Sequence, residues 1–180
     1  MDISRKGEVL VCAHESGYIL LWSLDKNKRL TKIKPPDKSS ILCVKFLYDT
    51  KQYLLVSTSK GSLYQYKVQD SLFKVDADKT LLMFSDKSQA HQNPAAKSFP
   101  EGFFNIQILP VDDFKDHPLC NYTVIALASM EKVMIVVLEP EFRIVFISKR
   151  NPVVPDHVVP CISWGRGCVP GNLFTSEICV

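Results

Sequence analysis

The sequence predicts an all-β fold, a partial β-propeller of about three blades with four antiparallel strands each. Three observations support this prediction. Short apolar segments recur with turn residues between them, their spacing matches one four-stranded blade, and no segment carries a long amphipathic helical pattern. Eleven prolines among the 180 residues punctuate the gaps between the apolar segments, which also disfavours long helices.

The clearest repeat joins two glycine-led segments. Gly17–Trp22 aligns without gaps with Gly61–Tyr66, 44 positions later. One blade of a WD-repeat-like propeller occupies about 40–45 residues, so this offset corresponds to one blade. The alignment extends backwards, because Leu10–Ala13 falls on Leu54–Ser57 and places an apolar strand ahead of each glycine. Two strands per repeat are therefore matched in two copies.

A third, weaker copy follows. Ile125–Ala128 precedes Lys132–Val137, and Lys132 stands 71 positions after Gly61, where the repeat would have its turn glycine. The excess over one period is assigned to two polar stretches, residues 85–102 and residues 112–118, which have the composition of loops. The longer stretch is a polar insertion for which disorder is favoured over a recognition role.

Other short apolar segments supply the remaining strands. Ile41–Phe46 and Phe103–Leu109 suit innermost strands, whereas Arg29–Ile33 and Phe142–Ile147 suit outer strands. Val158–Trp164 would begin a further blade. The predicted domain is thus an incomplete propeller over 1–180, with blade-like units at about 1–34, 41–84 and 103–148, another starting at 158, and the inserted loop at 85–102.

Each blade should bury apolar residues on both faces against its neighbours. Trp22, Tyr66 and Val137 occupy equivalent positions after the central strand, where a large side chain can fill the gap between adjacent sheets. We interpret them as packing residues. The residues predicted for the core are Ile19, Leu21, Leu63, Ile125, Leu127, Met134 and Val136.

The strand count predicts an open first blade. Its second and third strands are assigned to Val9–Ala13 and Gly17–Leu24, which leaves no innermost strand before them. An incomplete ring exposes apolar faces and unpaired strand edges. We therefore expect residues 1–180 alone to be poorly soluble or multimeric.

Composition excludes several classes of protein. A net charge of +3 with 23% charged residues lacks the strong basic stripe of a nucleic-acid binder. No apolar run approaches the roughly 20 residues that cross a bilayer, and the chain opens without the apolar core of a secretory signal. We expect a cytoplasmic protein whose six scattered cysteines are reduced thiols.

Few residues suggest a chemical site. His117 and Cys120 are the only local pair that could indicate zinc, but a structural zinc site needs four ligands and no second pair follows. Gly165–Gly167 has one Gly-x-Gly step without the third glycine and helix of a phosphate loop, so a turn is the simpler interpretation. No nucleophile elbow occurs. The sequence predicts no catalytic, cofactor-binding or metal-binding residue.

One basic cluster stands out between residues 25 and 38. It holds six basic residues against Asp25 and Asp37. The cluster could meet an acidic partner or an anionic lipid, but lysines also protect exposed sheet edges, and we favour that interpretation. Its basic members are Lys26, Lys28, Arg29, Lys32, Lys34 and Lys38.

The sequence resembles the vacuolar protein sorting-associated protein 8 family, the subunit that distinguishes the CORVET endosomal tether. The resemblance rests on Gly17–Leu24, on Ile41–Phe46 and most of all on the run from Phe114–Pro118 through Val124–Ser129; Lys132–Pro140 and Val159–Trp164 follow in the expected order. Departures are Ser23, where a Trp-Asp pair would have its aspartate, the long insertion after Phe84, and residues 168–180, which this resemblance does not place.

The resemblance implies the N-terminal propeller of a large scaffold that continues into an α-solenoid and a RING-like zinc module. It implies no enzymatic activity and no cofactor. The implied partners are other tethering subunits and an early-endosomal Rab GTPase, with peripheral association to early and late endosome membranes. Two alternatives stay open, a propeller of another vesicle-coat or tethering subunit and a propeller enzyme whose site lies in other blades.

Overall fold

The computed structural model describes residues 1–14, 16–47, 53–68, 75–82, 102–109, 121–149, 161–166 and 176–179. The chain divides into two compact units, Met1–Phe103 and Phe104–Val180, which are considered separately. Among the described residues, strands are the only regular secondary structure in the two units. The predicted all-β class is therefore confirmed.

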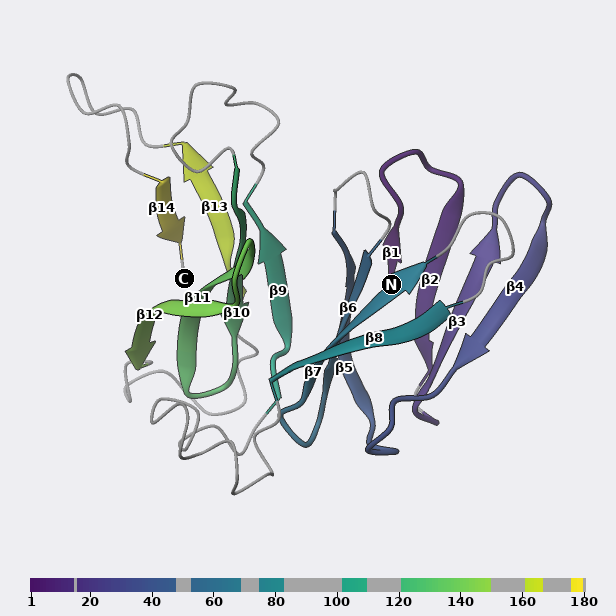
Figure 1. The fold of residues 1–180 in the computed structure, drawn as a ribbon, viewed down its shortest axis with the longest axis horizontal. Helices are drawn as coiled ribbons and strands as arrows, with labels where there is room; N and C mark the ends of the chain where they lie inside the picture. Colours follow the sequence, from purple (N-terminus) through teal and green to yellow (C-terminus); the bar gives the residue numbers. More distant parts are fainter. Residues whose placement is uncertain are drawn as a thin grey trace. The chain divides into compact units, whose positions relative to one another are not determined.

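The first unit holds two antiparallel four-stranded sheets, each with its strands side by side in chain order (Figure 1). This up-and-down arrangement is that of propeller blades. The first sheet consists of β1 (Asp2–Ile3), β2 (Val9–His14), β3 (Tyr18–Ser23) and β4 (Lys28–Ile33), and the second of β5 (Ile41–Phe46), β6 (Tyr53–Thr58), β7 (Leu63–Val68) and β8 (Val75–Leu82).

The prediction that the first blade lacks an innermost strand is wrong. The two residues of β1 pair with β2, with Asp2 opposite Val11. A tight turn makes room for this short strand before Val9. Gly7, with φ of 73°, donates its amide to the Ser4 carbonyl at 2.8 Å, and the Ser4 hydroxyl accepts from the Val9 amide at 3.0 Å.

The repeat read from the sequence is visible in the turns between second and third strands. Gly17 and Gly61 both adopt positive φ, 78° and 82°, a conformation that glycine takes without steric cost. The third copy has no glycine because a side chain holds its turn. There the Ser129 hydroxyl accepts from the amides of Glu131 at 3.3 Å and Lys132 at 3.1 Å.

The second unit contains one four-stranded sheet in the order β12-β11-β10-β9 and a two-stranded sheet of β13 and β14. With the two sheets of the first unit, this makes three four-stranded antiparallel sheets, as predicted. Gly165 and Arg166 lie in β13, so the predicted turn is wrong for these two residues, and Gly167 lies outside the described residues. The strands are β9 (Asn105–Ile108), β10 (Thr123–Ala128), β11 (Lys132–Glu139), β12 (Arg143–Lys149), β13 (Ser163–Arg166) and β14 (Ser176–Cys179).

The predicted core is confirmed residue by residue. All seven residues assigned to it have no exposed surface, and Tyr66 and Val137 are also buried. Trp22 is the exception, with 37% of its surface exposed, so its assignment as a packing residue is wrong in this structure. The reason is that no described residues cover the face of β3 on which Trp22 lies.

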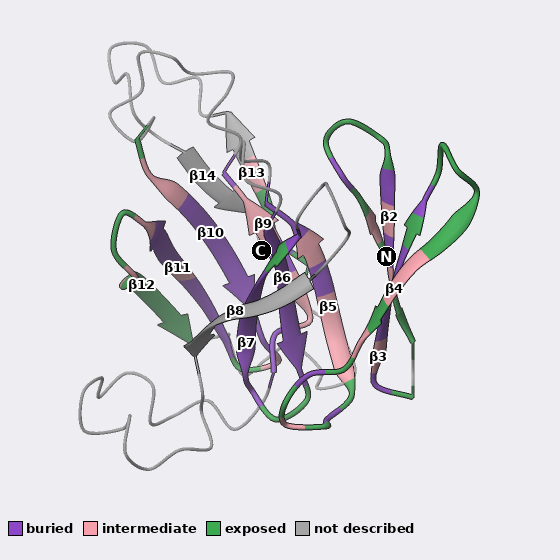
Figure 2. Cartoon of the chain, turned by 45° about the vertical axis from the view of Figure 1, so that its right-hand side comes forward, coloured by how far each residue is buried: buried purple, intermediate pink, exposed green. Residues whose placement is uncertain are grey.

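The first two sheets share one hydrophobic core. Val11, Ile19 and Leu21 from the first sheet pack with Leu54 and other residues of the second. Figure 2 shows the resulting contrast, with β6 and β7 largely buried and β4 partly exposed and partly half-buried. The remaining buried members of this core are Val9, Val44, Phe46, Val56, Tyr64, Tyr66 and Val68.

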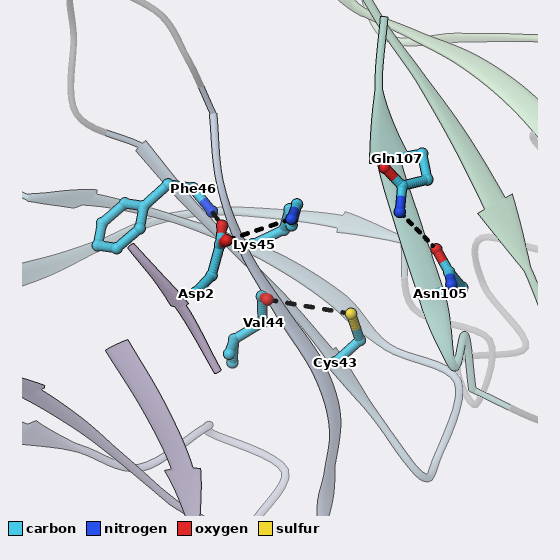
Figure 3. Close-up of polar contacts among 7 residues, drawn as sticks. All are labelled: Asp2, Cys43, Val44, Lys45, Phe46, Asn105 and Gln107. Atoms are coloured by element: carbon cyan, nitrogen blue, oxygen red, sulfur yellow. Dashed lines mark hydrogen bonds and ion pairs between the residues drawn. The ribbon is translucent and has the colours of Figure 1, made fainter. Parts of the chain in front are cut away.

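A polar link also joins the first two sheets. The Asp2 carboxylate accepts a hydrogen bond from the Phe46 amide at 2.8 Å and forms an ion pair with Lys45 at 3.2 Å (Figure 3). Lys45 and Phe46 belong to β5, so this carboxylate connects the innermost strands of the two sheets. Such a link fixes the sheets in register in a way that apolar packing alone does not.

Candidate functional site

The densest polar cluster among the described residues surrounds Asp37, in the connection between β4 and β5. One carboxylate oxygen accepts from the Ser39 amide at 3.1 Å, and the other accepts from the Thr58 hydroxyl at 2.8 Å. The Lys60 ammonium donates to the Asp37 carbonyl at 3.2 Å. Asp37 therefore ties the incoming loop to the turn between β6 and β7.

The protonation states of this cluster follow from its surroundings. Partial burial alone would raise the pKa of Asp37, but polar groups of Ser39, Thr58 and Ser62 outweigh it and hold the pKa below its ordinary value. Burial raises the pKa of Tyr64, and it raises that of Tyr66 much further. At neutral pH the cluster contains an ionised carboxylate beside protonated phenols.

Three hydroxyl groups in this region are buried. Within the part of the chain that the structure describes, the hydroxyls of Ser39, Ser62 and Tyr66 make no hydrogen bond of good geometry. The hydroxyls of Ser39 and Ser62 still stabilise the charge on Asp37 by their proximity. Buried polar groups without a partner are the places where an ordered water is usually found.

The chemistry of the cluster is that of an anchor. A general base works best when its pKa lies near the working pH, whereas the environment of Asp37 moves its pKa in the opposite direction. Both carboxylate oxygens already accept hydrogen bonds from the protein. The arrangement stabilises a loop against a strand turn and supplies no activated group.

Three of the six residues of the basic cluster predicted at residues 26–38 lie on an edge strand. β4 is the outermost strand of the first sheet, and its Lys28 and Arg29 are exposed. The Lys32 ammonium lies 3.4 Å from the centre of the Tyr18 ring, with that of Lys34 at 5.0 Å. Two of the six basic groups thus make cation–π contacts on their own sheet, in agreement with the interpretation of a protected sheet edge.

The structure gives less information on the other candidate sites from the sequence. His117 and Cys120, like residues 85–101 of the insertion, lie outside the described residues. Among the residues that are described, no three His, Cys, Asp or Glu side chains come together as a metal site would need. Cys12, Cys43 and Cys161 are free thiols. No helix in the described ranges is long and apolar enough to cross a membrane.

The Asp37 cluster was not predicted from the sequence, although a signal exists. Asp37-Lys38-Ser39 places a carboxylate two residues before a backbone amide, the spacing of an Asx turn, directly ahead of a predicted strand. The partner hydroxyl, Thr58, lies 21 residues away on another strand. Only the fold brings these two groups together.

The chain is similar to known proteins along nearly its whole length. The family model described as "Vps8 beta-propeller" matches residues 1–176. The vacuolar protein sorting-associated protein 8 homologs of mouse and human are each 24% identical over 166 residues, which covers 91% of this chain. The chain spans 11% of the length of these curated relatives.

A solved structure supports the fold. The β-propeller domain of Cps50 (Swd1) from Myceliophteria thermophila superposes with a TM-score of 0.50 at 10% sequence identity. The match covers 91% of this chain and 46% of that domain. At this identity the likeness concerns architecture alone, and it agrees with four-stranded sheets that form part of a propeller ring.

Proposed function

We propose that this chain, which belongs to the Vps8 β-propeller family, is a non-catalytic interaction module of an endosomal membrane-tethering complex. The family places it in the context of vacuolar protein sorting. In this role the propeller is a rigid scaffold whose edges and loops contact other subunits of the tether. The observation that carries the proposal is the family match over residues 1–176.

The chemistry of the described residues supports a scaffold over an enzyme. Their densest polar cluster centres on Asp37, whose carboxylate is held ionised and has both oxygens engaged by Ser39 and Thr58. Catalysis would require a nucleophile with a nearby base of suitable pKa. The cluster provides neither.

The finer role that we propose is that of an effector of an early-endosomal Rab GTPase. The protein would act from the cytoplasm, peripheral to early and late endosome membranes, and would bind the membrane through the complex. This finer role is what the resemblance to the family implies, and the family match over residues 1–176 supports the sorting context in which it would act.

A pull-down of the full-length protein tests this role. With the full-length protein as bait, we expect to recover more of a GTP-locked early-endosomal Rab than of the GDP-locked form. We expect the other tethering subunits to be recovered with either form of the Rab. Equal recovery with the two Rab forms would contradict the effector role. Absence of the other subunits would contradict the scaffold role.

The competing proposal of an enzyme is tested separately. We expect no turnover by the full-length protein on a broad panel of hydrolase substrates. Turnover that is abolished by Asp37→Asn, in a protein whose melting shows that it stays folded, would replace the scaffold role with a catalytic one.

A further inference from the structure

One face of the first sheet carries a row of apolar side chains that contact water. Residues that pair directly across neighbouring strands lie on the same face of a sheet. Pairing of the inner three strands sets Ile3 opposite Leu10 and Leu10 opposite Trp22. On the outermost strand, Arg29 lies opposite Trp22. Ile3 exposes 47% of its surface and Trp22 37%, and Leu10 is half-buried.

A second row of residues lies beside the first on the same face. Cys12 pairs with Leu20, and Lys32 lies opposite Leu20 on β4. Cys12 and Leu20 are half-buried, and the Lys32 ammonium lies over the Tyr18 ring. The two rows together form a surface that is apolar over the inner three strands and basic on the outermost one. We call this surface the open face.

The matching face of the second sheet is covered. There Phe46 pairs with Leu54, and Leu54 pairs with Tyr66, so these three residues repeat the apolar row of the open face strand by strand. Each of them is at most 1% exposed. They belong to a hydrophobic core that the first sheet completes. In this repeat, a neighbouring four-stranded sheet is therefore what covers the face.

The central strands of the three four-stranded sheets show the same contrast. β6 and β7 of the second sheet, and β10 and β11 of the third, are buried at nearly every position, so both of their faces are covered. In β2 and β3 of the first sheet, buried residues alternate with half-buried or exposed ones along most of each strand. Because successive side chains of a strand point to opposite faces, this alternation means that only one face is fully covered by the described residues.

We propose that the open face is the docking surface for a further four-stranded sheet of the same propeller, which packs on it as the first sheet packs on the second. A propeller ring closes through sheets that cover one another. The solved propeller domain agrees with this occupant in its fold, because the match with this chain accounts for 46% of that domain. The inference rests on the packing of the first two sheets and stands whether or not the tethering role is correct.

The second sheet also indicates what the covering sheet presents. There the matching face meets Val11, Ile19 and Leu21, which belong to β2 and β3. The covering sheet should therefore offer aliphatic residues from its own two central strands. A second copy of this chain fits the open face less well, because these three residues of each copy are already packed against its own second sheet and have no exposed surface.

Cys12 is a native reporter of the open face, because it is a half-buried free thiol in the row that it forms with Leu20. Alkylation by iodoacetamide, followed by mass spectrometry of the peptide that holds Cys12, measures its accessibility. We expect Cys12 to react more slowly in the full-length protein, purified alone and without lipid, than in a dilute solution of residues 1–180, by roughly tenfold or more. Ser16→Cys, at an exposed turn of the same sheet, is the matched control and should react equally in both.

Photo-cross-linking identifies what covers the open face. With p-benzoylphenylalanine in place of Trp22, we expect the full-length protein to capture a peptide of its own chain whose apolar residues alternate as in a strand. Capture of a segment with helical periodicity would overturn the proposal, as would equal labelling of Cys12 in the two proteins. Protection of Cys12 that disappears on dilution of the full-length protein would assign the face to a second copy. Protection that appears only with vesicles of phosphatidylserine and phosphatidylcholine would assign it to a membrane, and either result would overturn the proposal.

Discussion

Equivalent faces of the first and second sheets have very different environments. On the second sheet, Leu54, Val56, Tyr64 and Tyr66 belong to the core shared with the first sheet, and each is at most 4% exposed. The residues 44 positions earlier are Leu10, Cys12, Leu20 and Trp22, of which the first three are half-buried and Trp22 is exposed.

This difference shows that the neighbouring sheet, and not residue type, sets burial in the repeat. Tryptophan is larger and at least as apolar in its ring as tyrosine, yet Trp22 is exposed where Tyr66 is buried. The second sheet has the first sheet against this face. No described residues serve the first sheet in the same way.

The largest expected effect contrasts these two aromatic residues. Tyr66→Ala should lower the free energy of unfolding by about 3–5 kcal/mol, because it removes a large side chain from a closed core. Trp22→Ala should cost clearly less than Tyr66→Ala, since 37% of the surface of Trp22 is already exposed whereas Tyr66 is buried. Urea denaturation of both variants measures the contrast, and comparable losses would show that the face of Trp22 is covered.

A second difference between the two sheets is that residues 102 and 103 lie close against the second sheet. A Cβ on Gly102 would lie 1.9 Å from the Thr58 carbonyl oxygen and 2.6 Å from a Leu42 methyl group. Gly102→Ala should therefore destabilise the chain by about 1–3 kcal/mol or more through overpacking.

Gly7 on the first sheet is the control for that substitution. A Cβ there would meet no atom within 4 Å, and only the positive φ of 73° opposes it. Gly7→Ala should cost about 1 kcal/mol, the usual penalty of a left-handed alanine. A smaller melting shift for Gly102→Ala than for Gly7→Ala would contradict the close approach of this segment.

The Asp37 anchor belongs to the second sheet alone and should give a pH-dependent effect. Asp37→Asn should lower stability at neutral pH by about 1–2 kcal/mol, because it weakens hydrogen bonds to a charged acceptor. The pKa of Asp37 is lower in the folded chain than its ordinary value, so its contribution is present above that ordinary value, near pH 4, and is lost as the pH falls through the lowered pKa.

Urea denaturation of the wild type and of Asp37→Asn, measured about every pH unit between pH 2 and pH 7, gives the free energy of unfolding of each protein as a function of pH. The two stabilities should differ at neutral pH and converge at the acidic end of the series. A difference that stays constant across the series would show that the charge on Asp37 is not what stabilises the loop.

The smallest expected effect lies on the exposed face of the first sheet. Lys32→Met removes the ammonium group above the Tyr18 ring and should cost about 0.5–1 kcal/mol, the range for an exposed cation–π contact. Lys28→Met, on the same strand without a described ring contact, should change stability by less. An equal loss of stability for Lys28→Met and Lys32→Met would show that the contact of Lys32 with the Tyr18 ring does not stabilise the chain.

Much of the fold could be predicted from the sequence because the strands repeat in type and spacing. The paired glycines, Gly17 and Gly61, fixed the period, and the alternation of apolar residues identified the core. The innermost strand β1 was missed because two residues, Asp2 and Ile3, are too few to show a period. The exposure of Trp22 was missed because burial depends on the neighbouring sheet.

The polar and edge features were harder to predict. The Asp37 anchor depends on Thr58 from another strand, and a contact of that kind has no local pattern. β12 was predicted as an outer strand, but the exposure of its apolar centre depends on what packs against it. In both cases the pattern of one segment does not give the surroundings of that segment.

One pair of identical substitutions tests the central claim, that the first sheet buries one face of the second, while its own equivalent face is covered less fully by the described residues. Leu54 and Leu10 are equivalent in the repeat, and Leu54 has no exposed surface. Urea unfolding should show a loss of about 2–5 kcal/mol for Leu54→Ala and less than about half of that for Leu10→Ala. Equal losses for the two variants would contradict the claim.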